Sequence, residues 1–85
     1  PIAPHNICGP VGTYAAAHVC AAIPNFLALE FHHLDNEIWT GLVEEGDTLI
    51  DAGHIPIGNR PGLGLTLIED SVRACAREDL GFLQP

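Results

Sequence analysis

The chain has 85 residues with 11 acidic and 3 basic side chains, which gives a formal net charge of -8 at pH 7. All three basic residues are arginines, so the sequence has no basic cluster to bind nucleic acid or an anionic membrane surface. Hydrophobic residues make up 47% of the chain and charged residues only 16%, which is too apolar for an acidic disordered tail. We therefore expect a folded segment that binds neither nucleic acid nor membranes.

Length and cysteine usage suggest that this segment is part of something larger. A domain of this size buries only about 60–65% of its unfolded surface and often needs disulfide bonds or a structural metal ion for stability. Cys8, Cys20 and Cys75 are an odd number without the paired spacing of a secreted disulfide scaffold. The longest apolar run, residues 14–23, contains a histidine and is far shorter than the roughly 20 residues of a membrane span. We therefore expect a cytoplasmic protein with reduced thiols.

Residues 1–10 contain three prolines and predict a loop that leads into a helix, because proline suits the first helical turn. The alanine-rich residues 11–23 predict that helix, which Pro24 and Asn25 end. The helix is apolar almost all round, so we expect protein on most of its surface. The face expected to pack against a sheet consists of Val11, Ala15, Val19 and Ile23.

Residues 26–31 form a short apolar run that predicts a strand buried on both faces, as in a parallel sheet. Asp35 then predicts the N-cap of a short helix over residues 36–43. Loop, helix, strand and second helix follow one another as in a βα unit that runs into the next strand of a barrel or doubly wound sheet. One such unit cannot complete a parallel-sheet domain, which again favours a segment of a larger protein.

The second half of the chain predicts turns and short elements. Residues 48–57 predict a small hairpin centred on Ala52 and Gly53. Residues 59–64 predict a tight turn, because they lack the Lys-Ser/Thr pair of a phosphate-binding loop. A last helix is expected over residues 69–78.

His5 is the first candidate for chemistry. It lies just before the predicted helix, where the carboxyl end of a strand would sit in an α/β barrel, and barrel enzymes take catalytic groups from that position. Histidine exchanges a proton near neutral pH, as general acid or base work requires. The alternative is a surface or capping histidine.

Glu30 is the second candidate, because a carboxylate at the end of an apolar run should avoid the interior unless it is paired or hydrogen-bonded. At the carboxyl end of the next strand it would face the same end of the barrel, the site mouth, as His5. A carboxyl group there can stabilise an enolate oxygen. The alternative is a strand-end glutamate that reaches solvent.

Other chemistries have little support in the sequence. His32 and His33 are adjacent, but no Cys-x-x-Cys or His-Glu-x-x-His spacing accompanies them, which disfavours zinc. We expect one of these two rings near the mouth of the site. The only serine, Ser71, falls in the last predicted helix, which argues against a serine hydrolase.

The motifs in their order resemble the C-terminal end of the mandelate racemase branch of the enolase superfamily. The resemblance rests on Ala-Pro-His-Asn at residues 3–6, Gly-Pro-Val at 9–11, the alanine-rich helix, Ala-Ile-Pro-Asn-Phe at 22–26, Leu-Glu at 29–30, Trp39, the hairpin over 51–57 and Arg-Pro-Gly-Leu-Gly at 60–64. It implies an α/β fold in three parts. Residues 1–46 would be the last βα units of a (β/α) TIM-like barrel, residues 47–68 a hairpin and turn returning to an α+β capping domain, and residues 69–85 a C-terminal helix and tail.

The same resemblance implies a Mg²⁺-dependent lyase, most like the galactonate-type sugar-acid dehydratases. In this family a proton is abstracted next to the substrate carboxylate and an enediolate forms. By matching motifs, His5 would act as acid or base and Glu30 would hydrogen-bond the substrate carboxylate. Asn6 and His32 would bind substrate. The Mg²⁺ ligands would lie outside these 85 residues, so no metal ligand is expected in this segment.

Two alternatives remain open at the level of sequence. A racemase or epimerase of a 2-hydroxy acid would use His5 as one of two bases on opposite faces of the same carbon. A small non-enzymatic interaction module would use the apolar helix over residues 11–23 to hold a partner. For the enzyme, the expected partners are the remainder of the parent chain, a small sugar acid and further copies of the protein in a homo-oligomer.

Overall fold

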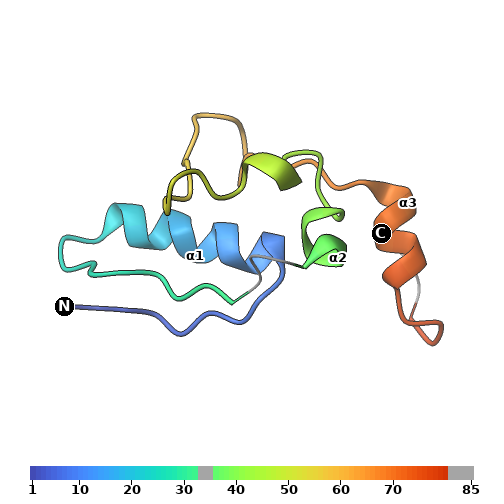
Figure 1. Cartoon of the computed structure of the whole chain (residues 1–85), viewed down its shortest axis with the longest axis horizontal. Helices are drawn as coiled ribbons and strands as arrows, with labels where there is room; N and C mark the ends of the chain where they lie inside the picture. Colours follow the sequence, from blue (N-terminus) through green and yellow to red (C-terminus); the bar gives the residue numbers. More distant parts are fainter. Residues whose placement is uncertain (33–35, 81–85) are drawn as a thin grey trace.

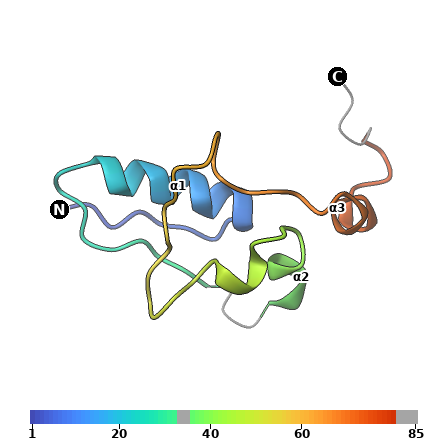
Figure 2. The ribbon, with the colours of Figure 1, turned by 90° about the horizontal axis from the view of Figure 1, so that it is seen from above.

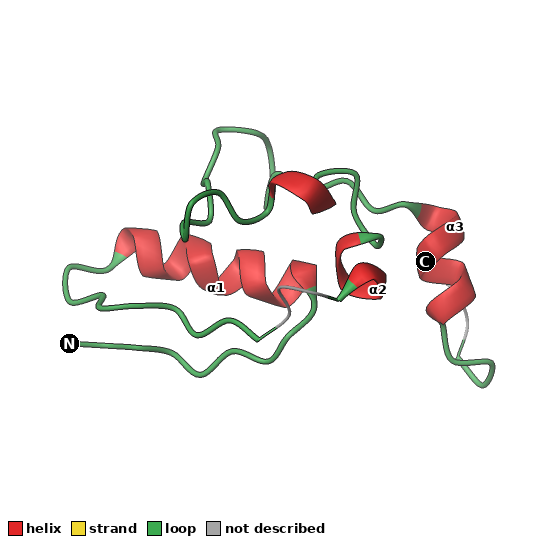
Figure 3. Cartoon of the chain, in the orientation of Figure 1, coloured by secondary structure: helices red, strands yellow, loops and turns green. Residues whose placement is uncertain are grey.

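The computed structural model describes residues 1–32 and 36–80, and its elements are four helical segments joined by long irregular stretches. In chain order these are α1 (Pro10–Ala22), α2 (Glu37–Thr40), the 3₁₀ turn η1 (Gly46–Thr48) and α3 (Glu69–Cys75) (Figure 1). No strand is assigned within the described residues, which Figure 3 shows as helices and loops. The expectations for His33, the Asp35 cap and the end of the tail at 81–85 lie outside the described residues.

Helix α1 lies within one residue of its expected position at each end. Pro10 occupies the first turn, and Ile23 leaves the helix in an extended conformation before Pro24. The expected packing face is wrong, because Val11 and Val19 are 45% and 60% exposed. The buried residues lie on another face and are Pro10, Thr13, Tyr14, Ala17 and Cys20.

Contacts with distant segments explain which face of α1 is buried. The Tyr14 hydroxyl donates to the Pro56 carbonyl at 2.8 Å, and the His18 ring lies 3.1 Å from the Leu63 carbonyl through Nε2. Asn6 of the N-terminal segment hydrogen-bonds Thr13. The polar groups of α1 therefore select the face, whereas the aliphatic pattern alone does not.

Two extended segments run parallel and side by side along α1, as Figures 1 and 2 show from two directions. Ile2 bridges Phe26, with Ile2 N donating to Asn25 O at 2.7 Å and Leu27 N donating to Ile2 O at 2.8 Å. Further along, Glu30 N donates to Pro4 O at 3.3 Å. This is a parallel pairing with a helical crossover, the arrangement of a βα unit.

The run over residues 26–31 forms only a single bridge at Phe26, and it is not buried on both faces as expected. Phe26 is 44% exposed and Leu27 67% exposed. A parallel strand is buried on both faces only when other elements cover it. Among the described residues its backbone partner is the N-terminal segment, so the rest of this apolar surface stays open.

The core joins α1 to α2 and the segment that follows it. Tyr14, Trp39, Val43 and Leu49 form the buried cluster. Phe31, Ile55 and Leu65 pack against this cluster from the outside. Trp39 also donates from Nε1 to the Cys8 carbonyl at 2.9 Å, so it ties the N-terminal loop to this core. Trp39 is therefore a packing residue of this core.

Helix α2 is shorter than expected, and its N-cap in the described chain is Asn36. The Asn36 side-chain oxygen accepts from Trp39 N at 3.0 Å, which satisfies one of the free amides of the first turn. The chain leaves the helix after Thr40, and Val43 instead forms an antiparallel bridge with Leu67. Tertiary pairing thus ends a helix that local preference would continue to residue 43.

The predicted hairpin exists as a tight turn without extended strands. Asp51 and His54 exchange backbone hydrogen bonds at 2.8 and 2.9 Å, and Ala52 and Gly53 both have positive φ, 48° and 79°. Positive φ at both central residues is the type I′ geometry of two-residue hairpins. On the N-terminal side η1 ends at Thr48, and residues 49–50 are irregular where a strand was expected.

The turn over residues 59–64 is held by charge pairing. Glu45 accepts from Arg60 Nη2 at 2.7 Å with one carboxylate oxygen and from Thr66 N at 2.9 Å with the other. Loss of hydration raises the pKa of Glu45, but the hydrogen bonds from Thr66 and Arg60 outweigh it and lower the pKa to about 2. Gly64 N closes the turn on Pro61 O at 3.2 Å. These contacts support a structural role, as expected.

Helix α3 ends at Cys75, where we expected it to reach residue 78, and none of its residues is buried. It lies at the end of the molecule opposite the N-terminus (Figures 1 and 2). The chain exposes 6119 Å², against about 4,900 Å² for a compact protein of this mass. Part of that excess is large apolar side chains such as Leu27 and Ile38, each 67% exposed. In the described part of the chain, no helix is long and apolar enough to cross a membrane.

Candidate active site

His5 and Glu30 come together because the two extended segments pair in parallel. The Glu30 amide donates to the Pro4 carbonyl, next to His5, so both candidate side chains leave from the same end of the paired segments. His5 Nε2 lies 3.4 Å from Glu30 Oε2. The expectation that these two residues share one site mouth therefore agrees with the geometry.

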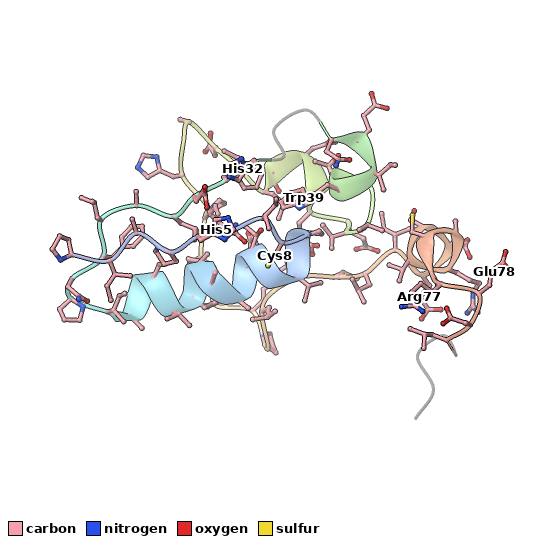
Figure 4. All side chains as sticks on the ribbon, turned by 90° about the horizontal axis from the view of Figure 1, so that it is seen from below. His5, Cys8, His32, Trp39, Arg77 and Glu78 are labelled. Carbon is pink, nitrogen blue, oxygen red and sulfur yellow. The ribbon has the colours of Figure 1, made fainter. Side chains whose placement is uncertain are left out.

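The Glu30 carboxylate lies between two histidines. His32 Nε2 is 2.7 Å from Oε1, and His5 approaches the other oxygen. The backbone amide of Asn6 also donates to Oε2, at 2.9 Å. Figure 4 shows the His5 and His32 rings directed toward the same region beside the paired segments.

The hydrogen bond from His32, followed by that from the Asn6 amide, holds the pKa of Glu30 below its ordinary value. Positive charge on His5 or His32 acts in the same direction. Because an ionised carboxylate only accepts hydrogen bonds, His32 must carry the proton on Nε2 in this contact. The cluster thus combines a carboxylate acceptor with two imidazole rings, a side chain that can act as a general acid or base.

The cluster is open to solvent on one side. The His5 side chain is 76% exposed and the Glu30 side chain 37% exposed. His5 and Glu30 line a hollow of about 460 Å³ together with Ala3, Ala28 and Leu29. The Glu30 carboxylate and the His5 ring are therefore placed to meet a small polar molecule.

Asn6 differs from the other three predicted site residues, because it is only 3% exposed. We expected it to contact substrate, but its side-chain amide is bonded within the chain. Nδ2 donates to Thr13 Oγ1 and to the Glu30 carbonyl, each at 3.0 Å, and Oδ1 accepts from Cys8 N at 3.3 Å. Sequence reasoning missed Thr13, whose only signal is a hydroxyl in an otherwise alanine-rich helix.

Within residues 1–32 and 36–80, no group of three or more His, Cys, Asp or Glu side chains is arranged to hold a metal ion. These residues do not by themselves fit a Mg²⁺ site. Cys8 and Cys75 are exposed free thiols and Cys20 is a buried one. What the described site residues offer is proton transfer at His5 and His32 and hydrogen bonding at Glu30.

Comparison with known proteins connects this site to a family. A family model described as enolase C-terminal domain-like matches residues 1–71. D-xylonate dehydratase from Haloferax volcanii is 55% identical over 74 residues, which are 87% of this chain and 18% of that protein. A mandelate racemase/muconate lactonizing enzyme-like protein from Rubrobacter xylanophilus, known as a crystal structure, matches with a TM-score of 0.87 and 46% identity, over 99% of this chain and 22% of that one.

The chain therefore spans about a fifth of the length of these relatives. The enolase C-terminal domain is a barrel domain, so the expected α/β barrel segment is confirmed at that level. The resemblance to the mandelate racemase/muconate lactonizing enzyme branch, on its sugar-acid dehydratase side, is confirmed as well. Since the family model covers 71 of the 85 residues, the chain belongs to the enolase C-terminal domain-like family.

Proposed function

We propose that the full-length protein is a sugar-acid dehydratase and that this segment supplies His5 and Glu30 to its active site. The observation that carries the proposal is the contact of His5 with the Glu30 carboxylate, in a chain 55% identical to a protein named D-xylonate dehydratase. Members of this superfamily use Mg²⁺ to stabilise the enediolate. We place its ligands, and the base that opens the reaction, outside this segment.

In the proposed reaction a base removes the proton next to the substrate carboxylate, and the C3–oxygen bond then breaks. Protonated His5 donates its proton to the departing hydroxyl, so water leaves and an enol remains. The enol then tautomerises to the 2-keto-3-deoxy acid. His5 suits this role because its ring is exposed and its Nε2 lies 3.4 Å from Glu30 Oε2.

Glu30 and His32 are proposed to receive the substrate carboxylate. Two carboxylates repel one another, so a hydrogen bond between them needs a shared proton. His32, 2.7 Å from Glu30, is placed to supply that proton. Contact between substrate and this pair would orient the reacting carbon toward His5.

The architecture proposed for the full-length protein follows the sequence expectation. Residues 1–46 belong to the last βα units of the barrel, residues 47–68 return to an α+β capping domain, and residues 69–85 form the C-terminal helix and tail. The open apolar surface around Phe26 and Leu27 then packs against the remainder of the barrel. We propose a cytoplasmic homo-oligomer as the working form.

The deciding experiment incubates the full-length protein and Mg²⁺ with a panel of aldonates that includes D-xylonate. We expect a 2-keto-3-deoxy acid, detected by NMR and by carbonyl derivatisation. Proton exchange at C2 with epimerised substrate and no keto acid would instead support the racemase alternative. No turnover of any aldonate, with Mg²⁺ present and the protein folded, would contradict the proposal.

Glu30→Gln is expected to raise KM for the sugar acid and lower kcat, together reducing kcat/KM by about 10²-fold. The amide keeps the size of the carboxyl but cannot share a proton with His32. Steady-state kinetics on the full-length enzyme measures the change, with Glu44→Gln, an exposed glutamate outside the cluster, as the matched control. Kinetics like those of the unmodified enzyme would remove Glu30 from the site.

A further inference from the structure

A buried polar cluster lies directly behind the Glu30 carboxylate and consists of Asn6 and Thr13. Thr13 is 1% exposed and Asn6 3% exposed, and they are the buried polar residues of the described chain. Asn6 belongs to the N-terminal segment and Thr13 to the first turns of α1. Buried polar groups destabilise the fold unless they are hydrogen-bonded. The hydrogen-bonded pair therefore restricts the position of the N-terminal segment relative to α1.

The chemistry of the partners determines which atoms of Asn6 and Thr13 donate hydrogen bonds and which accept them. The Glu30 carbonyl can only accept a hydrogen bond, so the amide nitrogen of Asn6 must face it. Asn6 Nδ2 donates one hydrogen bond to this carbonyl and a second one to Thr13 Oγ1. The Thr13 hydroxyl has a single proton, and its acceptors within reach are the Cys8 carbonyl at 3.2 Å and Asn6 Oδ1 at 3.4 Å. Every donor of the two side chains is thus used inside the chain.

These bonds reach both ends of Glu30. The Asn6 side chain holds the Glu30 carbonyl, while the Asn6 backbone amide holds the carboxylate oxygen Oε2 at 2.9 Å. His5, which immediately precedes Asn6, lies against the same oxygen. A shift of Asn6 would therefore move the His5 ring and the Glu30 carboxylate relative to one another.

We propose that Asn6 and Thr13 are positioning residues, a buried clamp that sets the geometry of His5 against Glu30 without touching substrate. The inference rests on the proposed function, and it assigns Asn6 a role different from the substrate contact that the sequence suggested. Since the clamp acts through Glu30, its effect on catalysis should depend on whether the Glu30 carboxylate is present.

Thr13→Val in the full-length enzyme removes the hydroxyl and keeps the shape, and is expected to lower kcat by roughly tenfold to hundredfold. Thr13→Ser retains the hydroxyl and should restore most of the activity. Thr48→Val is the matched control, because its hydroxyl is exposed and bonds only the local Glu45 carbonyl at 3.0 Å. All variants are assayed well below their melting temperatures, so a general loss of stability does not enter kcat.

A double-mutant cycle separates positioning from stability. If the clamp acts through Glu30, Thr13→Val should cost much less in a Glu30→Gln background than in the unmodified enzyme. If Thr13→Val folds poorly, the same double-mutant cycle can be measured with Asn6→Asp, which replaces the donating nitrogen by an oxygen. If Thr13→Val lowers kcat by the same factor in both backgrounds, or leaves kcat unchanged, the clamp proposal is wrong but the proposed role of Glu30 stands. If Glu30→Gln alone has the kinetics of the unmodified enzyme, both the clamp and the proposed role of Glu30 are wrong.

Discussion

Replacing His5 by asparagine is expected to lower kcat of the full-length enzyme by about 10²- to 10⁴-fold, the usual contribution of a general acid or base. Asparagine keeps a polar group near Glu30 Oε2 but has no proton to transfer at neutral pH. Because His5 is not part of the buried core of this segment, the substitution should leave the melting temperature nearly unchanged. Keto-acid formation and thermal unfolding measured on the same preparation test both halves of the expectation.

His54→Asn is the matched control for that experiment. His54 is exposed, its Nδ1 lies 3.0 Å from the Ala52 carbonyl, and it belongs to the type I′ turn and does not line the hollow beside His5 and Glu30. The same change of residue type there should leave turnover intact. Full turnover by the His5 variant would show that His5 is structural, and the reaction would then need its acid from elsewhere in the protein.

Gly46→Ala is expected to have the largest effect on stability, about 3 kcal/mol or more. A Cβ at Gly46 would lie 1.9 Å from the Thr40 carbonyl oxygen and 2.7 Å from its carbon. Both atoms are backbone, so relief requires moving the end of α2 or the turn η1. Either movement disturbs Val43 and Leu49, which are buried in the core.

Gly58→Ala provides the comparison for this prediction, because a Cβ there meets nothing within 4 Å. Urea unfolding of the two full-length variants should show a lower midpoint for Gly46→Ala and little change for Gly58→Ala. Equal midpoints would mean that the connection between α2 and η1 adjusts without cost.

Short-range signals in the sequence predicted the elements that depend on neighbouring residues. Pro10 and Pro24 bracket α1 within one residue, and the positive φ values at Ala52 and Gly53 fall where the turn was expected. The helix over residues 36–43 was predicted too long, because a pairing between Val43 and Leu67, 24 residues apart, took precedence. Such pairings leave no periodic trace in either segment.

The candidate site also contains residues that local sequence signals indicate and residues that only the fold brings together. His5 and Glu30 were predicted as candidates because their motifs, and a carboxylate at the end of an apolar run, are visible in the sequence. Thr13 was not found, because a threonine in an alanine-rich helix has no special pattern until Asn6 folds onto it. The exposed state of the run at 26–31 was also unpredictable, since burial of a strand depends on elements beyond it.

Composition and local preference therefore account for an acidic, apolar α/β segment with one long helix and for its two candidate catalytic residues. Tertiary structure decided which face of α1 is buried and that Glu30 lies between His5 and His32. The physical reason is the range of the interactions. Caps and turns involve neighbours a few residues apart, whereas the hydrogen bonds that orient Glu30 join Asn6 to a residue 24 positions away.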